Sequence, residues 1–227
     1  MTRGIYITGT DTGAGKTFAS ACLLHALRAQ GLSAVGMKPV ASGCAMTDEG
    51  WRNEDALALQ AASSPRPDYA LVNPFALPEP TAPEIAAARA GVALSLPPIL
   101  AAYAQLAARA DVVVVEGVGG WLAPLTATLD QSDLVRALDL PVILVVGLRL
   151  GCINHARLTA RAIAAEGFAF AGWIGSAVDP ALAFPDETFA ALERVLPGPC
   201  LGRLPFAPGM DAAALAGHIV PGDWRCA

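Results

Sequence analysis

Residues 9–17 read GTDTGAGKT, and this glycine-rich run separates an apolar stretch from a helical pattern. The segment IYIT at residues 5–8 predicts a short buried strand, and residues 17–30 follow helical spacing. A strand, a glycine-rich turn and a helix in this order are typical of a phosphate-binding loop, because the turn and the helix N-terminus present backbone N–H groups to phosphate oxygens. Lys16 can then reach the β- and γ-phosphates, and the Thr17 hydroxyl can bind Mg²⁺. The sequence therefore predicts a nucleoside triphosphate site that uses the γ-phosphate.

The spacing of this loop differs from the usual G-x-x-x-x-G-K-[ST] pattern. Gly9 comes one residue early, and Thr10 stands in the usual first glycine slot. The alternative is an ordinary glycine turn beside a surface lysine. The flanking strand and helix patterns favour the phosphate-binding interpretation, because they are the structural context that such a motif requires.

Strand-like and helix-like segments alternate along the rest of the chain, and several of the strands are apolar on both faces. This pattern predicts an α/β fold, a single domain over residues 1–227 with an open, mostly parallel sheet and helices on both faces, of the phosphate-loop NTPase type. Residues 43–52 and the six prolines of residues 65–83 predict irregular loops, and the last stretch of about 15 residues carries weak signals and is expected to be loose. The other expected strands are 34–38, 111–116, 141–146 and 168–174, and the expected helices are 53–62 (capped by Asn53), 99–109, 132–138 (capped by Ser132), 152–166 and 185–196.

Composition excludes several classes of function. The net charge is −5 and no basic stripe occurs, which argues against nucleic acid as a partner. The longest strongly apolar run, residues 140–148, is too short for a membrane span of roughly 20 residues, and the N-terminus reaches the phosphate loop too soon for a signal peptide. The five cysteines are odd in number and form no CxxC pair, so we expect no zinc site or disulfide framework and a reducing, cytoplasmic location.

Charged residues follow the predicted strands at the edge where ligands bind in open α/β sheets. Glu116 ends the run VVVV, and a carboxylate at this place can hold Mg²⁺ against a triphosphate. Asp55 is in the first turn of a predicted helix, where it could also serve only to stabilise the helix N-terminus. Lys38 ends a strand and can stabilise charge on a transferring phosphoryl group, although a strand end reaching water is the simpler alternative. Ser42 follows in a short loop and can contact a substrate.

Five blocks in this order resemble the dethiobiotin synthase family. They are GTDTGAGKT, KPVASG at 38–43, RNEDALALQ at 52–60, VEGVGGWLAPL at 115–125 and PVILVVGLRLGCINHA at 141–156. The similarity runs from residue 5 to about residue 178 and continues more weakly to Phe206. It implies an ATP-dependent cyclo-ligase of biotin synthesis, in which CO₂ adds to one amine of 7,8-diaminononanoate as a carbamate, ATP phosphorylates the carbamate, and the second amine closes a cyclic urea. It also implies a homodimer with active sites at the subunit interface.

The resemblance assigns roles by position. It implies that Lys16 and Lys38 are the catalytic, charge-stabilising lysines, and that Thr17, Asp55 and Glu116 bind Mg²⁺. It implies substrate contacts from Thr12 and Ser42 and, at a helix start of the partner subunit that holds the tail carboxylate, from Gly151, Cys152, Ile153 and Asn154. The expected ATP-binding set is Thr12, Gly13, Ala14, Gly15, Lys16, Thr17, Phe18, Asp55, Glu116, Gly117, Val118, Gly119, Ser176, Ala177, Pro205, Phe206 and Ala207.

The sequence departs from the family pattern at three places. An acidic residue and a valine are usual where Gly13 and Ala14 stand. An Asn-Asp pair that reads adenine is usual where Ser176 and Ala177 stand, and a tyrosine that helps to hold the substrate carboxylate aligns near Thr188.

Two other classes of protein share the phosphate loop. Dimeric switches that position partners or membranes often carry a second lysine inside the loop and a C-terminal amphipathic helix, whereas this loop has Gly13 and this tail reads PGDWRCA. Amidoligases of cofactor synthesis usually carry an additional glutamine-hydrolysing domain, for which 227 residues leave no room.

Overall fold

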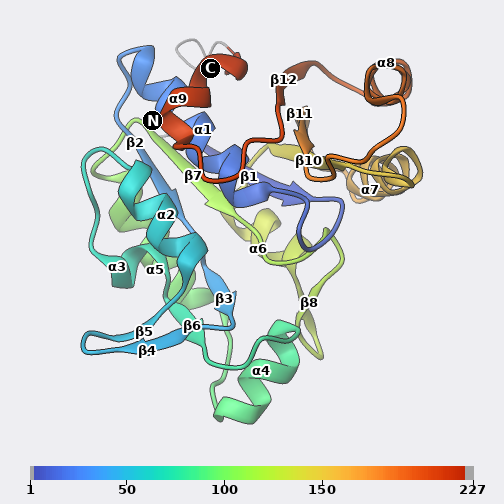
Figure 1. The fold of residues 1–227 in the computed structure, drawn as a ribbon. Helices are drawn as coiled ribbons and strands as arrows, with labels where there is room; N and C mark the ends of the chain where they lie inside the picture. Colours follow the sequence, from blue (N-terminus) through green and yellow to red (C-terminus); the bar gives the residue numbers. More distant parts are fainter. Residues whose placement is uncertain (1–2, 223–227) are drawn as a thin grey trace.

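A computed structural model describes residues 3–222 of the chain (Figure 1). Within these residues, six strands form one sheet in the order β12-β11-β10-β1-β7-β2, and every neighbouring pair is parallel. The predicted parallel sheet is therefore confirmed. Its strands are β1 (Arg3–Gly9), β2 (Ala34–Met37), β7 (Val112–Glu116), β10 (Val142–Leu148), β11 (Phe170–Ala177) and β12 (Cys200–Leu204).

Helices cover both faces of the sheet, as the doubly apolar strands predict. In β10, Ile143 and Val145 pack into the core that α1 contributes to, whereas Leu144 and Val146 pack with residues of α7 and α8. Burying such a side chain contributes about 1.5–3 kcal/mol, so each strand is held from two sides. The first face carries α1 (Lys16–Ala29), α2 (Glu54–Ala62) and α9 (Ala212–Leu215), and the second carries α5 (Leu96–Ala107), α6 (Gln131–Leu138), α7 (Cys152–Ala165) and α8 (Pro185–Val195).

Two segments that were expected to be loops are regular structure, so these expectations were wrong. Residues 43–52 contain the hairpin of β4 (Ala45–Thr47) and β5 (Gly50–Arg52), which projects from the fold (Figure 1). Residues 65–83 contain α3 (Tyr69–Val72) and β6 (Phe75–Leu77). The prolines lie between these elements, and β6 gains its hydrogen bonds by pairing with β3 (Val40–Ser42), a partner distant in sequence.

The N-cap residue predicted from the sequence is correct for one helix and wrong for another. Asn53 caps α2 as predicted, because its side chain accepts a hydrogen bond from the Ala56 N–H at 3.2 Å. Ser132 does not cap α6. The helix begins one residue earlier, at Gln131, where Asp130 and Asp133 form a capping box.

The other elements give no clear signal in the sequence. They are α4 (Pro83–Ala90), β8 (Pro124–Thr126), β9 (Leu129–Asp130) and, near the C-terminus, β12, α9 and the 3₁₀ turn η1 (Ala216–His218). The tail that we expected to be loose thus has α9 and η1 packed against α1, and residues 223–227 lie outside the described residues. Over residues 3–222, no helix has the length and apolar character that a membrane crossing needs.

Candidate active site

Most of the predicted site residues lie at the carboxyl edge of the parallel sheet, because they are at the ends of its strands or in the loops that follow them. Lys38 follows β2, Glu116 ends β7, and the glycine-rich loop follows β1. On the other side of β1, residues 149–154 follow β10, residues 176–177 end β11, and residues 205–207 follow β12. Ligands of open α/β sheets bind outside this edge.

A cleft of about 1160 Å³ opens at this edge. Its walls extend from the glycine-rich loop to residues 80–83 at the start of α4, to Trp121 and Leu122, and to Leu158 and Thr159 of α7. The predicted residues that line it are Thr12, Gly13, Gly15, Lys16, Thr17, Phe18, Lys38, Ser42, Asp55, Val118 and Gly119.

The glycine-rich loop holds Lys16 inside the cleft. Gly13 and Gly15 have φ angles of 74° and 84°, a left-handed conformation that glycine adopts at little cost. Lys16 Nζ donates hydrogen bonds to the carbonyl oxygens of Asp11 at 3.1 Å and Gly119 at 2.7 Å. Burial, followed by repulsion from Lys38, lowers the pKa of Lys16 to about 8.

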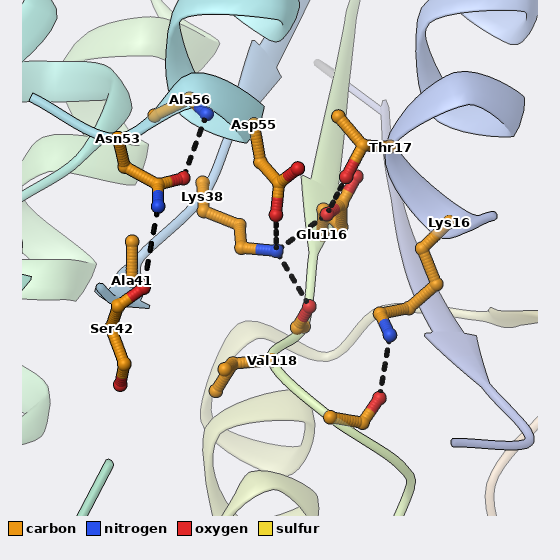
Figure 2. Close-up of polar contacts among 12 residues, drawn as sticks. Lys16, Thr17, Lys38, Ala41, Ser42, Asn53, Asp55, Ala56, Glu116 and Val118 are labelled. Carbon is orange, nitrogen blue, oxygen red and sulfur yellow. Dashed lines mark hydrogen bonds and ion pairs between the residues drawn. The ribbon is translucent and has the colours of Figure 1, made fainter. Parts of the chain in front are cut away.

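Lys38 lies between two carboxylates in the floor of the cleft (Figure 2). Its Nζ is 2.6 Å from Glu116 Oε1 and 3.1 Å from Asp55 Oδ2, and it also donates to the Gly117 carbonyl at 3.3 Å. Burial disfavours the ammonium, but attraction to Glu116 and Asp55 outweighs it and raises the pKa of Lys38. Burial alone would raise the pKa of the Asp55 carboxyl group, but the charge of Lys38 and a hydrogen bond from Thr17 lower it below its ordinary value. The lysine is therefore charged at neutral pH.

Three oxygen-bearing side chains beside Lys38 could hold a divalent cation. Thr17 Oγ1 donates to Glu116 Oε1 at 2.8 Å, and Asp55 points to the same place (Figure 2). Glu116 Oε2 is buried and has no hydrogen-bond partner. Buried polar atoms usually have a partner, so this oxygen is a candidate ligand of a cation. Among residues 3–222 no group of three or more His, Cys, Asp or Glu residues could hold a metal by itself. This sparse set fits Mg²⁺, because Mg²⁺ completes its coordination with phosphate oxygens and water.

Some predicted residues lie outside the lining of this cleft. Ala14, Glu116 and Gly117 lie below its surface, and the buried Ser176 packs behind the loop, where a Cβ at Gly15 would collide with its Oγ. Ala177, residues 205–207 and the α7 start at Gly151, Cys152, Ile153 and Asn154 are near the same sheet edge but do not line the described cleft.

Sequence reasoning missed contacts that join distant segments. Arg149, after β10, forms an ion pair with Asp11 of the glycine-rich loop. Gln131 of α6 holds the loop after β7 through Val118 and Gly120. Arg149 comes after a predicted strand and Gln131 comes just before a predicted helix, but nothing local identifies the partners of either residue.

Comparisons with known proteins show which sequences and folds this chain resembles. The family model described as an AAA domain matches residues 3–214. An ATP-dependent dethiobiotin synthetase BioD from Xanthomonas euvesicatoria pv. vesicatoria (strain 85-10) is 67% identical over 211 residues, which cover 93% of this chain and 94% of the relative. One of the same name from Xylella fastidiosa (strain 9a5c) is 61% identical over 217 residues, which cover 95% of this chain and 96% of the relative.

Two solved structures share the fold at low identity. The septum site-determining protein MinD with Mg-ADP from Pyrococcus horikoshii has a TM-score of 0.52 and 16% identity, over 97% of this chain and 88% of that one. The signal recognition particle receptor FtsY from Elizabethkingia anophelis has a TM-score of 0.51 and 14% identity, over 97% of this chain and 66% of that one. These likenesses show the phosphate-loop fold alone. The extent and identity of the two synthetase matches show more: the chain belongs to the family of ATP-dependent dethiobiotin synthetases.

Proposed function

We propose that the chain converts 7,8-diaminononanoate, CO₂ and ATP into dethiobiotin, ADP and phosphate, as a step of biotin synthesis in the cytoplasm. The observation that carries this proposal is the convergence of two buried lysines, Lys16 and Lys38, on one cleft that also holds two carboxylates. Such an arrangement stabilises negative charge on a phosphoryl group and on its acceptor.

The reaction divides into three steps. One amine nitrogen adds to CO₂ and loses a proton, which gives a carbamate. A carbamate oxygen then bonds to the γ-phosphorus of ATP while the bond to the ADP oxygen breaks. The second amine finally attacks the carbonyl carbon, loses a proton and expels phosphate, so that a cyclic urea remains.

The residues of the chain stabilise charge at each step in this scheme. The N–H groups of residues 13–17 bind the triphosphate, and Lys16 leaves the Gly119 carbonyl for the β- and γ-phosphates. Lys38 faces the carbamate and the transferring phosphoryl group, and Thr12 and Ser42 contact the diamine from the cleft wall. Ser42 Oγ is buried without a hydrogen-bond partner, which leaves it available to a substrate.

Thr17, Asp55 and Glu116 would hold Mg²⁺ in this scheme. When bound, the ion neutralises charge that develops on the β- and γ-phosphate oxygens. Phe18, Val118 and Gly119 line the cleft, and we assign them to the nucleotide. We assign the base to residues 176–177 and 205–207, at the ends of β11 and β12, the two strands that lie beyond β10 in the sheet order.

We further propose that the protein acts as a homodimer. Gly151, at the start of α7, has a φ of 93° and leaves the first N–H groups of this helix without partners inside the helix. These groups favour an anion. Since they do not line the cleft of their own chain, we assign them to the substrate tail carboxylate of the other subunit. The described cysteines, Cys22, Cys44, Cys152 and Cys200, are free thiols, which suits a reducing compartment.

The experiment is phosphate release by the purified protein with ATP, Mg²⁺, bicarbonate and diaminononanoate. We expect release to require the diamine, and the product to have the mass of the cyclic urea. Equal release with and without the diamine would contradict the proposal and would favour a slow ATP-hydrolysing switch.

The variant Lys38→Ala sharpens this experiment. We expect it to lower turnover by about 100-fold or more, while the Kd of ATP changes much less, because Lys38 acts on charge that develops in the reaction. Arg161→Ala is the matched control, because it removes a positively charged side chain at a separate small cavity on α7. It should leave both the turnover and the Kd of ATP unchanged. Equal losses of turnover and ATP affinity in Lys38→Ala would make the lysine a nucleotide ligand only.

A further inference from the structure

Gln131 is a buried amide whose four hydrogen bonds converge on one loop and one strand. Its side chain Oε1 accepts from the Tyr6 hydroxyl at 2.7 Å and from the Val118 N–H at 2.8 Å. Its Nε2 donates to the carbonyls of Val118 and of Gly120, the latter at 2.6 Å. An amide has two acceptor and two donor sites, so this side chain is fully satisfied, and the residue is only 2% exposed.

The loop that Gln131 holds is the one that receives both lysines. The Gly117 carbonyl accepts from Lys38, and the Gly119 carbonyl accepts from Lys16. The sequence of this loop, GVGG, has little conformational preference of its own, and Gly119 adopts a φ of 66°. The hydrogen bonds of Gln131 with Val118 and Gly120 therefore restrict a backbone that its own residues leave free to adopt several conformations.

Local structure fixes Gln131 itself. It is the first residue of α6, behind the capping box in which the Asp130 N–H donates to Asp133 Oδ2 at 2.9 Å. Leu134 and Val135 anchor the same helix in the core. The amide is thus attached to a helix that is anchored in the core, and its hydrogen bonds reach back to a glycine-rich loop.

We infer that Gln131 is a positioning residue, which holds residues 117–120 so that the Gly117 carbonyl keeps Lys38 in place and the Gly119 carbonyl holds Lys16 until ATP binds. Its effect on turnover rests on the proposed function, whereas its effect on loop order does not. The four hydrogen bonds of Gln131 go to Tyr6, Val118 and Gly120 and none goes to residues 13–17, whose N–H groups hold the triphosphate in the proposed function, so the loss of Gln131 should lower turnover more than ATP affinity.

The first test compares Gln131→Met with the matched control Tyr6→Phe. Gln131→Met keeps the length of the side chain and removes all four hydrogen bonds, whereas Tyr6→Phe removes one bond and leaves the three bonds to the loop. We expect Gln131→Met to lower kcat about 10- to 100-fold with a much smaller change in the KM of ATP, because small misplacements of catalytic groups reduce rates on this scale. Tyr6→Phe should stay close to the unmodified protein. Equal losses of kcat and of thermal stability in the two variants would give Gln131 a structural role only and overturn the inference.

The second test measures amide hydrogen exchange in residues 117–121 and needs no turnover. Gln131→Met should speed exchange in this segment, because the Val118 N–H loses its acceptor, and Tyr6→Phe should not. Exchange and kcat like those of the unmodified protein in a folded Gln131→Met variant would overturn the inference. If this variant does not fold, Gln131→Asn keeps the amide on a shorter side chain that cannot reach both Val118 and Gly120; it should lose kcat in the same way, and a retained kcat would likewise overturn the inference.

Discussion

Lys38 Nζ lies 2.6 Å from Glu116 Oε1, and the side chains are 4% and 0% exposed. A buried ion pair is sensitive to the loss of one partner, because the other charge is then left without compensation. The same pair is far less sensitive to the neutral replacement of both partners. This asymmetry distinguishes the stability role of the pair from any role in turnover.

We expect Lys38→Met to lower the free energy of unfolding by about 3–5 kcal/mol in ligand-free protein, because Glu116 becomes a buried unpaired charge. Adding Glu116→Gln to this variant should restore most of the loss. Urea unfolding at pH 7 without nucleotide measures both changes. Independent, additive effects of the two substitutions would show that the charges are not coupled.

The two left-handed glycines of the phosphate loop should differ in their tolerance of a side chain. Gly13→Ala should cost about 1–2 kcal/mol from its φ of 74° alone, because a Cβ there meets nothing within 4 Å. Gly15→Ala has a similar φ and also collides with Ser176, so it should cost more and should weaken ATP binding further. Urea unfolding and calorimetric titration with ATP give the two values. Adding Ser176→Gly to Gly15→Ala should recover part of the loss, and its failure to do so would exclude the collision as the cause.

Arg149 should protect ATP binding by pairing with Asp11. In Arg149→Met, the Asp11 carboxylate would stand unpaired beside the triphosphate. We expect ATP affinity to fall about 3- to 10-fold, or about 1 kcal/mol, and to fall less in high salt. The double variant with Asp11→Asn should recover affinity in a calorimetric titration. A loss that Asp11→Asn does not relieve would mean that Arg149 contacts the nucleotide directly.

At the opposite edge of the sheet, Asp111 should make stability depend on pH. Its Oδ2 accepts from the Ser33 N–H at 2.8 Å and from the Ser33 hydroxyl at 2.6 Å, and these bonds lower the pKa of Asp111 from its ordinary 3.8. A carboxylate with a lowered pKa in the folded state stabilises the fold above its ordinary pKa, and this contribution is lost as the pH falls through the folded-state pKa. Asp111→Ala should therefore cost about 0.5–1 kcal/mol at pH 7, a modest value because solvent screens the exposed site, and progressively less as the pH falls below 3.8. Urea unfolding at several pH values tests this, and a difference that is independent of pH would contradict it.

Much of the fold follows from local patterns. The runs around Val113 and Val145 are apolar at every position, and only strands buried on both faces require this, so the parallel sheet could be predicted. The strand β12 could not, because Gly202 and Arg203 interrupt its pattern, and it is held by its neighbour β11. The strands of the hairpin β4–β5 have three residues each and none of these residues is buried, so no hydrophobic periodicity marks the hairpin.

The residues of the site also divide into those that the sequence could predict and those that it could not. Lys38 and Glu116 end strands, and a sequence shows where strands end. Gln131 is different, since its hydrogen bond to Tyr6 spans 125 positions and depends on how α6 packs against β1. Contacts of this kind are decided by tertiary structure and leave no trace in local spacing.

The pairing of Lys38 with Asp55 and Glu116 has a consequence for the charge balance of the ligand-free protein. The two carboxylates already have an ammonium between them, so the fold carries its own counter-ion. Many small metal sites fold only when the ion arrives. In this chain Lys38 already compensates part of the charge of both carboxylates, so a divalent ion bound there would share them with an ammonium group.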